Sequence, residues 1–323
     1  MSKNVLITGI TGFSGSHLAE HCINKGYNVF GLTRGRYHQY TFINHIKDKL
    51  NLIEGDLSDI HSVMNCLKIS QPEVIFHLGA MTSVPYSWNA PKVTIDTNSL
   101  GTLNILESIR KIDIDPIVVN IGTSEEYGLV HPDEVPIKET NPLRPLSPYA
   151  VSKIASDMFG YQYFKSYGLK IIRLRPFNII GPRGGQEIVT ANFATQIAKI
   201  EKGMRKPYVE VGNLDSIRDF NDVRDIVRAY DISTKNCKFG DVYNICTGEG
   251  ITIYSLLRKM INLSKISHET VVEFRAKDER MRPSDVVNLI GDSTKFKEQT
   301  GWKQEYTLDD SIITILNYWR QHA

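Results

Sequence analysis

Cysteine is scarce in this sequence, and the few cysteines are scattered. The chain of 323 residues has four, Cys22, Cys66, Cys237 and Cys246, and no two of them form a CxxC pair. That spacing argues against both a disulfide framework and a zinc site. We therefore expect no bound metal and a reducing compartment, the cytoplasm.

The sequence also lacks long apolar runs and an excess of charge of one sign. No apolar stretch approaches the ~20 residues that a membrane span needs, and the N-terminus enters "NVLITGITG" without the features of an export signal. The formal net charge is +2 and opposite charges are interspersed, so no basic stripe follows a nucleic-acid backbone. These absences predict a soluble, unexported protein that binds neither membrane nor nucleic acid.

The first half of the sequence has a regular alternation of strand and helix patterns. With 41% hydrophobic and 23% charged residues, the composition is that of a globular protein. Short apolar runs predict buried strands at residues 4–8, 28–32, 50–56, 73–80, 116–122 and 169–176, separated by helical patterns such as residues 147–167. Such alternation is typical of an α/β protein with a Rossmann-type, doubly wound parallel sheet covered by helices on both faces.

The pattern changes after Pro176, where turns become frequent and the elements less regular. We predict a dinucleotide-binding domain over residues 1–176, to which residues 217–247 return. A smaller α+β lobe, built from residues 177–216 and 248–323, is expected to lie over the carboxyl edge of the sheet. Ligands of open α/β sheets bind at that edge.

A glycine-rich turn follows the first predicted strand. In "TGITGFSG", Gly9, Gly12 and Gly15 have the spacing GxxGxxG, which puts small residues where the backbone approaches a pyrophosphate and where helix packs on strand. The pattern alone is weak, but its position between a strand and a helix favours a dinucleotide site over a turn without a ligand. The same predicted cofactor site includes Thr11, Phe13 and Ser14.

The end of the second strand indicates which dinucleotide binds. An acidic side chain there would bind the ribose hydroxyls of NAD, whereas "LTRGR" has none and offers Thr33, Arg34 and Arg36. Arginine suits the 2′-phosphate of NADP through charge-assisted hydrogen bonds. NADP is therefore favoured, and NAD is the alternative if these arginines are only solvated loop charges. Further cofactor contacts are expected from Asp56, Leu57, Leu78, Gly79 and Ala80.

The segment "SPYAVSK" has a tyrosine and a lysine four residues apart. In a helix, Tyr149 and Lys153 lie one turn apart on one face, and Thr123, Ser124 and Glu125 directly follow the fifth predicted strand. A neighbouring ammonium lowers the pKa of a phenol, so Tyr149 is the predicted acid/base for a substrate alcohol, with a hydroxyl of Thr123 or Ser124 sharing the proton. Lys153 would also hold the nicotinamide ribose. The alternative is an ordinary surface pair on a helix.

Several motifs together resemble a known family. The stretches "TGITGFSGSHLAE", "HLGA", "TSEEYG", "SPYAVSK", "RPFNIIGPRG", "VGNLDSIRDF" and "RPSDV" are similar to those of the extended short-chain dehydrogenase/reductases that act on nucleotide sugars. "TSEEYG", "GNLDSIRDF" and "RPSDVVNLIGDSTK" most resemble the GDP-mannose 4,6-dehydratases and the related GDP-4-keto-6-deoxymannose reductases. The resemblance implies a GDP-linked sugar as substrate, a nucleotide-sugar-binding C-terminal lobe and a homodimer or homotetramer.

The resemblance also assigns roles to residues. It puts Thr123, Tyr149 and Lys153 in the family's catalytic positions and Glu125 in that of an extra carboxylate. The substrate site that it implies consists of Ser83, Ser124 and Glu125, of Asn178, Arg218 and Arg282 for the phosphates and the sugar, of Thr190 and Lys199 near the guanine, and of Asp285 at its ribose. Asn192 departs from the dehydratase pattern, because a basic residue that contacts the neighbouring subunit and the cofactor is expected there.

The extra carboxylate bears on the reaction. Oxidation of a hexose at C4 makes the C5 hydrogen acidic, so a base removes it and the C6 hydroxyl leaves as water before hydride returns to C6. Glu125 suits the roles of that base and of the acid for the leaving oxygen. Thr123, rather than a serine, and the long Arg-bearing loop after Leu32 favour a 4,6-dehydratase acting on GDP-mannose or a GDP-linked heptose. The alternative is a 4-keto reductase that consumes NAD(P)H, or an epimerase of the family, because the reductases also tend to keep this glutamate. A binding protein without chemistry has no use for Tyr149 and Lys153.

Overall fold

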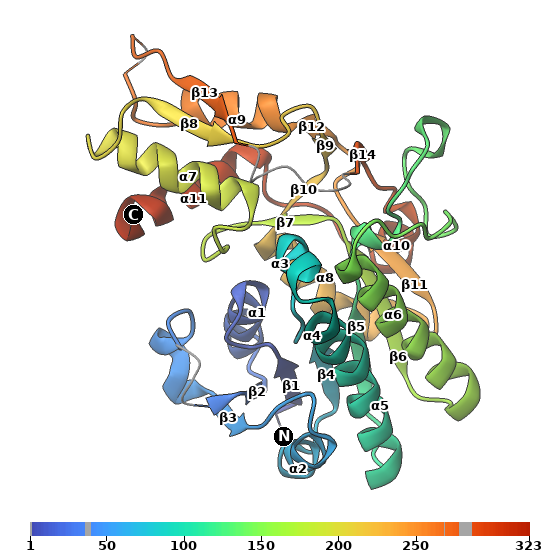
Figure 1. Ribbon diagram of the computed structural model, residues 1–323. Helices are drawn as coiled ribbons and strands as arrows, with labels where there is room; N and C mark the ends of the chain where they lie inside the picture. Colours follow the sequence, from blue (N-terminus) through green and yellow to red (C-terminus); the bar gives the residue numbers. More distant parts are fainter. Residues whose placement is uncertain (1, 36–39, 268, 278–285) are drawn as a thin grey trace.

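The structure, a computed structural model, describes residues 2–35, 40–267, 269–277 and 286–323. A seven-stranded parallel sheet forms its centre, with the strand order β11-β6-β5-β4-β1-β2-β3 (Figure 1). These strands are β1 (Asn4–Thr8), β2 (Asn28–Thr33), β3 (Asn51–Glu54), β4 (Val74–His77), β5 (Ile117–Ile121), β6 (Ile171–Pro176) and β11 (Val242–Ile245). The predicted doubly wound α/β fold is confirmed.

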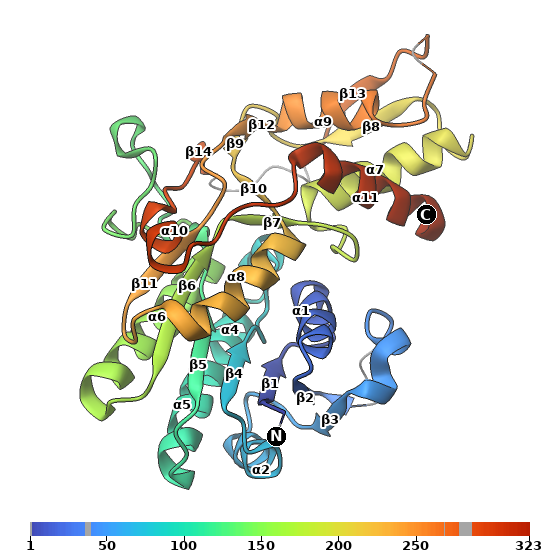
Figure 2. The ribbon, with the colours of Figure 1, turned by 180° about the vertical axis from the view of Figure 1, so that it is seen from behind.

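Alternate residues of the strands pack on opposite faces of the sheet. In β1, Val5 and Ile7 belong to the core that includes side chains of α1 (Phe13–Asn24) and α8 (Val223–Asn236). Leu6 points the other way, into a core with side chains of α2 (Ile60–Ser70), α5 (Gly101–Ile112) and α6 (Pro148–Tyr167). Figure 2 shows α1 and α8 together on the first face. Because both faces are covered, these strands are continuous apolar runs in the sequence.

The sheet reverses its strand order between β1 and β4, which are neighbours although they are not consecutive in the chain. At this switch point the loops after the two strands approach closely: a Cβ on Gly9 would lie 2.9 Å from the Gly79 nitrogen. The strands β3 and β4 are also shorter than predicted, because the residues after them turn away from the sheet at its carboxyl edge. Open α/β sheets bind ligands in the crevice at such a point.

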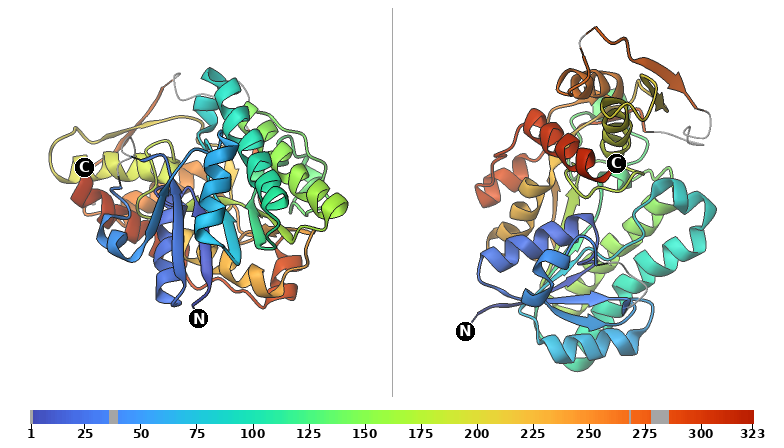
Figure 3. Two further views of the ribbon diagram at one scale, coloured as in Figure 1. Left: turned by 90° about the horizontal axis from the view of Figure 1, so that it is seen from below. Right: turned by 90° about the vertical axis from the view of Figure 1, so that its left-hand side faces the viewer.

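The remaining elements form a smaller lobe above the carboxyl edge of the sheet (Figure 3). Its core contains side chains of α7 (Val189–Glu201), α9 (Ile253–Asn262) and α11 (Leu308–His322), together with β8 (Tyr208–Val211), which pairs in parallel with β13 (Glu273–Ala276). Short ladders join β7 (Asn178–Ile180) to β10 (Phe220–Asp222), and β9 (Ile217–Arg218) to β12 (Ile251–Thr252) and β14 (Asn288–Leu289). The remaining helices are η2 (Asn44–Lys49), α3 (Val84–Asn89), α4 (Pro91–Ile95), η3 (Asp96–Leu100), η4 (Ser124–Glu126), η5 (Pro132–Glu134) and α10 (Thr294–Thr300).

The segment predicted to return to the first domain does so through two elements. The strand β11 pairs with β6 in the central sheet, and α8 packs on one face of that sheet. The domain boundaries themselves, residues 1–176 with 217–247 against 177–216 with 248–323, stay a prediction. In the described part of the chain, every helix is too short or too polar to cross a lipid bilayer.

Candidate active site

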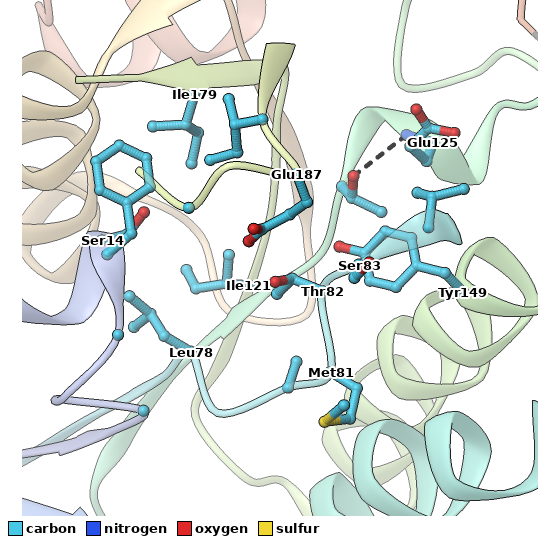
Figure 4. A pocket seen from close by; sticks show the side chains of 18 of the residues that line it. Ser14, Leu78, Met81, Thr82, Ser83, Ile121, Glu125, Tyr149, Ile179 and Glu187 are labelled. Atoms are coloured by element: carbon cyan, nitrogen blue, oxygen red, sulfur yellow. Dashed lines mark hydrogen bonds between the residues drawn. The ribbon is translucent and has the colours of Figure 1, made fainter. Parts of the chain in front are cut away.

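A cavity of about 1230 Å³ lies between the carboxyl edge of the sheet and the smaller lobe. Figure 4 shows side chains that project into it from both sides. The predicted site residues that line it are Gly9, Thr11, Gly12, Phe13, Ser14, Gly15, Thr33, Arg34, Asp56, Leu57, Leu78, Gly79, Ala80, Ser83, Thr123, Ser124, Glu125, Tyr149, Lys153, Asn178 and Arg218. The fold thus brings together residues that are spread over 210 positions of the chain, and the individual roles assigned to them stay predictions.

Two other predicted site residues, both in the described part of the chain, do not contribute to this lining. Thr190, in the first turn of α7, is fully buried, and Lys199 is half-buried near the end of the same helix. The residues of α7 that do reach the cavity are Val189, Asn192 and Phe193. The predictions for Arg36, Arg282 and Asp285 lie outside the described residues.

The turn after β1 has the shape of a phosphate cradle. Gly9 has a φ of +71°, and its carbonyl oxygen accepts the Gly12 N–H at 3.0 Å. A Cβ on Gly15 would lie 2.1 Å from that oxygen, so only glycine fits there. Because α1 begins directly after Gly12, its first N–H groups open on the cavity, as a pyrophosphate requires. The turn therefore fits a dinucleotide.

The end of β2 borders the same cavity. Thr33 is buried and its hydroxyl accepts the Gly35 N–H at 3.2 Å, while Arg34 also lines the cavity. Of the two arginines of "LTRGR", Arg34 is the one in the described part of the chain, and it lines the cavity. It has the guanidinium geometry that suits a 2′-phosphate.

The turn after β5 presents the predicted acid/base groups. Thr123 caps the short 3-10 helix η4, and its hydroxyl accepts the Glu125 N–H at 3.3 Å (Figure 4). Glu126 closes the turn from the other side, because its carboxylate accepts the Thr123 N–H at 2.9 Å. The side chain of Tyr149 reaches the same place from the start of α6, where Ser147 caps the helix by accepting the Ala150 N–H at 3.1 Å.

Burial dominates the protonation of the predicted catalytic pair. It raises the pKa of the Tyr149 phenol, which a hydrogen bond with Thr123 lowers and the charges of Glu125 and Glu126 raise further. Burial lowers the pKa of Lys153, and its ammonium donates a hydrogen bond to the Ile121 carbonyl. This contact holds the ammonium at the end of β5, and the predicted effect of Lys153 on the phenol pKa stays a prediction.

Asn98 holds the loop after β4 against α6, the helix that carries Tyr149 and Lys153. It lies in η3, a single π-helical turn between α4 and α5, a feature frequent at functional sites. Its side-chain oxygen accepts the Met81 N–H at 2.7 Å, and its amide donates to the Met81 carbonyl at 3.0 Å and to the Ser152 hydroxyl at 2.9 Å. Asn98 belongs to none of the sequence motifs. In the sequence, Asn98 is one of several polar residues within an amphipathic helical pattern, and nothing there sets it apart.

Arg183 joins the smaller lobe to the nucleotide end. It has a φ of +69°, which is unusual for a residue other than glycine. Its guanidinium donates to the Ser16 hydroxyl at 3.0 Å and to the Glu20 carboxylate at 2.7 Å, both on α1. The run "GPRGG" gives a turn signal in the sequence, but the partners of the arginine are more than 160 residues away.

Two further side chains of the cavity were also missed. Tyr230 of α8 is fully buried, and within the described part of the chain its hydroxyl has no hydrogen-bond partner. Burial and the proximity of Tyr149 raise its pKa. Glu187 projects into the cavity from the loop before α7 (Figure 4). Neither residue belongs to a motif, so the sequence alone gives no signal for them.

Comparisons with known proteins agree with this geometry. The sequence model of the family described as GDP-mannose 4,6 dehydratase matches residues 6–315. A GDP-mannose 4,6-dehydratase of Yersinia enterocolitica is 32% identical over 360 residues, which cover 99% of this chain and 96% of that protein. A GDP-6-deoxy-D-mannose reductase of Pseudomonas aeruginosa is 30% identical over 324 residues, covering 100% of this chain and 99% of that protein. The solved structure of RMD from Pseudomonas aeruginosa complexed with NADPH has a TM-score of 0.85 at 28% identity, covering 99% of this chain and 100% of that one.

Proposed function

Because the chain belongs to the GDP-mannose 4,6-dehydratase family, we propose that it is a nucleotide-sugar 4,6-dehydratase that acts on GDP-mannose with NADP as its cofactor. The family membership confirms the resemblance that the sequence motifs indicated. The observation that carries the proposal is that Thr123, Glu125 and Tyr149 line one cavity with the glycine turn. A dehydratase needs an acid/base for C4, a second one for C5 and C6, and a dinucleotide within reach of both.

The chain's own residues define how NADP would be held. The glycine turn and the start of α1 would bind the pyrophosphate, Thr33 and Arg34 the phosphorylated ribose, and Lys153 the nicotinamide ribose. A bound NADP would supply the hydride chemistry that a 4,6-dehydratase uses at C4 and C6 within one turnover. No external reductant is consumed.

The proton steps are divided between Tyr149 with Thr123, which act at C4, and Glu125, which acts at C5 and C6. Tyr149 removes the proton of the C4 hydroxyl while the neighbouring Thr123 hydroxyl, which lowers the pKa of the phenol, shares it. Glu125 then removes the C5 proton and delivers a proton to the departing C6 oxygen, which leaves as water. As hydride returns to C6, Glu125 returns a solvent-exchanged proton to C5, and Tyr149 gives up to solvent the proton that it took from the C4 hydroxyl. The sugar thus loses one molecule of water and becomes a 4-keto-6-deoxy sugar, and the protons removed and delivered balance.

The smaller lobe would bind the rest of the substrate. Arg218, only 6% exposed, and Asn178 line the cavity where the diphosphate and sugar would lie. Asn192 and Asn213 line the same cavity and are our candidates for the nucleoside end. We keep Thr190 and Lys199 as less direct candidates, because their side chains do not belong to that lining.

One observation favours a second candidate, a 4-keto reductase of the same family. The alignment with the Pseudomonas reductase runs over 324 residues, whereas that with the Yersinia dehydratase runs over 360 and must open gaps in a chain of 323. This chain is therefore closer in length to the reductase. The reductase would consume one NADPH per product and would need no C5 base.

Incubation of the purified protein with GDP-mannose in deuterated water, without added reductant, tests the proposal. We expect a product with a C4 ketone and deuterium at C5, formed with only catalytic NADP. A parallel incubation with a GDP-linked heptose tests the width of the sugar site. Unchanged sugars, combined with oxidation of NADPH when a GDP-4-keto-6-deoxy sugar is supplied, would replace the dehydratase by the reductase.

We also propose that the protein acts as a homodimer or homotetramer in the cytoplasm. The support for a reducing compartment is that all four cysteines are free thiols and three of them are buried. The support for an oligomer is only the family resemblance. Sedimentation analysis of the purified protein measures the oligomeric state directly.

A further inference from the structure

A buried charge network lies directly behind η4, the turn that presents Thr123 and Glu125. The side chain of Glu126 is 0% exposed and lies 2.9 Å from the Arg175 Nε of β6. Arg175 in turn donates to Asp157 of α6 at 2.6 Å, and Asp157 lies one turn after Lys153. Since Glu126 also accepts the Thr123 N–H, the network joins η4, β6 and α6, the three elements that meet at the predicted catalytic groups.

The surroundings are shaped to accommodate this carboxylate. A Cβ on Gly122 would lie 2.4 Å from the Glu126 Oε1, so the glycine before the turn leaves the space that the carboxylate fills. Arg175 is fixed on its other side by the Tyr127 hydroxyl at 3.1 Å, and that hydroxyl donates to the Asn244 side chain at 2.7 Å. The position of Glu126 is therefore determined from several directions.

The proposed mechanism gives Glu126 no part. Its side chain does not belong to the lining of the cavity, so it would touch neither substrate nor cofactor. A buried carboxylate is costly to keep, and an ion pair of this kind often stabilises a fold no better than apolar residues of the same volume. Its place one residue from Glu125 and behind Lys153 points to a role in the site instead.

We propose that Glu126 is a positioning residue of the active site: its carboxylate holds the turn that presents Thr123 and Glu125, and its negative charge acts on Lys153 and Tyr149. The activity test of this proposal rests on the proposed function, because it measures the 4,6-dehydratase reaction. Glu126 would affect that reaction only through the residues that it contacts.

The charged and titratable groups that face Glu126 are Asp157, Arg175, Lys153, Tyr149 and Tyr127. Burial raises the pKa of Glu126 to about 7, Asp157 raises it as well, and Arg175 and Lys153 lower it. In return, the charge of Glu126 raises the pKa of both Lys153 and Tyr149. Removal of this charge should therefore lower both pKa values.

The variant Glu126→Gln tests this electrostatic action, because it keeps an acceptor for the Thr123 N–H and removes the charge. We expect kcat to fall with little change in KM, and both limbs of the pH–kcat profile to move to lower pH by about one unit, the size of shift that one neighbouring charge causes. Glu134→Gln is the matched control, because Glu134 closes the turn η5 in the same way but its side chain is 21% exposed. Its profile should stay in place. A Glu126→Gln profile that also stays in place would overturn the proposal.

The shorter variant Glu126→Asp separates the two roles. It keeps the charge and loses reach, so kcat should fall while the profile stays at the wild-type pH. It also serves if Glu126→Gln folds poorly, because it retains a partner for Arg175. An Asp variant with wild-type kcat would refute the positioning role.

A second readout does not depend on activity. A carboxyl group whose pKa is raised on folding, from 4.5 to about 7 for Glu126, binds more protons in the folded state over that interval, so its contribution to stability falls as pH rises from 4.5 to 7. The melting temperature of wild type relative to Glu126→Gln should therefore decline over this range, and relative to Glu134→Gln it should not. If wild type is inactive with GDP-mannose, the proposed function fails and this measurement still decides on Glu126; a constant difference would overturn its assignment.

Discussion

Two short turns of this chain, η4 and η5, have the same capping arrangement in opposite environments. In η4 the carboxylate of Glu126 accepts the N–H of the capping residue Thr123, and in η5 that of Glu134 accepts the His131 N–H, both at 2.9 Å. Each glutamate has an arginine partner, Arg175 in the first turn and Arg144 in the second. The side chain of Glu126 is 0% exposed and that of Glu134 is 21% exposed.

The two environments shift the pKa values of the two carboxyl groups in opposite directions. Burial raises the pKa of Glu126 to about 7, whereas the hydrogen bond from Arg144 lowers the pKa of Glu134 to about 2. A common backbone motif thus closes one turn at the surface and one behind the candidate active site. The comparison teaches that the function of such a turn depends on what surrounds it.

The largest expected difference between the turns is catalytic. Glu125 of η4 and Asp133 of η5 have the same place in their turns, directly before the capping glutamate. Glu125→Gln should lower the rate of elimination by about 10²–10⁴, the contribution of a general acid/base. Asp133→Asn should leave it unchanged. The measurement is the release of the 4-keto-6-deoxy product at saturating GDP-mannose, and equal rates in the two variants would contradict the role of Glu125.

The arginine partners should differ next in their effect on stability. Arg175→Met leaves the charges of Glu126 and Asp157 without their shared partner in a buried place, which should destabilise the protein by about 3–5 kcal/mol at pH 8. Arg144→Met removes a partner at the surface and should change stability little, because solvent replaces it. Urea unfolding of both variants checks this. Equal urea midpoints for the two variants would contradict the expected difference between the two arginines.

Gly122→Ala should have an intermediate effect. The added methyl group would displace the Glu126 carboxylate, and such overpacking costs about 1–3 kcal/mol. In η5 the equivalent position is Val130, where a larger side chain is already present. The double variant with Glu126→Ala makes room for the methyl group, so the cost of Gly122→Ala should be smaller in that background. An identical cost in both backgrounds would point to the nearby Leu174 carbonyl instead.

The smallest effect is expected from Glu134→Gln. Its lowered pKa means that Glu134 stabilises the folded state above its ordinary value of 4.5 and loses that contribution as pH falls toward about 2. The melting temperature of wild type should therefore exceed that of the variant slightly above pH 4.5, and the difference should shrink on acidification. A difference that grows toward low pH would have the wrong sign for this ion pair.

Most of the fold could be predicted because its signals are local. The glycine turn at Gly9 to Gly15, the capping Ser147 and the apolar strand runs each need only a few neighbouring residues to be recognised. The convergence of Thr123, Glu125 and Tyr149 on the cavity follows from the carboxyl edge of a parallel sheet. That part of the site was therefore predictable before the structure.

The groups that no sequence motif reveals depend on distant partners. Glu126 looks like a second solvated acid in "TSEEYG" until Arg175, almost 50 residues later, is placed beside it. Arg183 likewise needs α1 and Tyr230 needs the packing of α8 on the sheet. Thr190 is the converse case. The resemblance implied a residue of α7, whereas the face of that helix that lines the cavity is set by packing in the smaller lobe.

The seclusion of the Glu126–Arg175–Asp157 cluster from water has a consequence for ionic strength. Mobile ions screen charges that they can surround, and at 0.15 M they do so over about 8 Å. The cluster admits no such ions, so its field at Lys153 should be nearly the same in dilute buffer and in concentrated salt. The charge balance around the reacting groups is in this way insulated from the changing salt content of a cell.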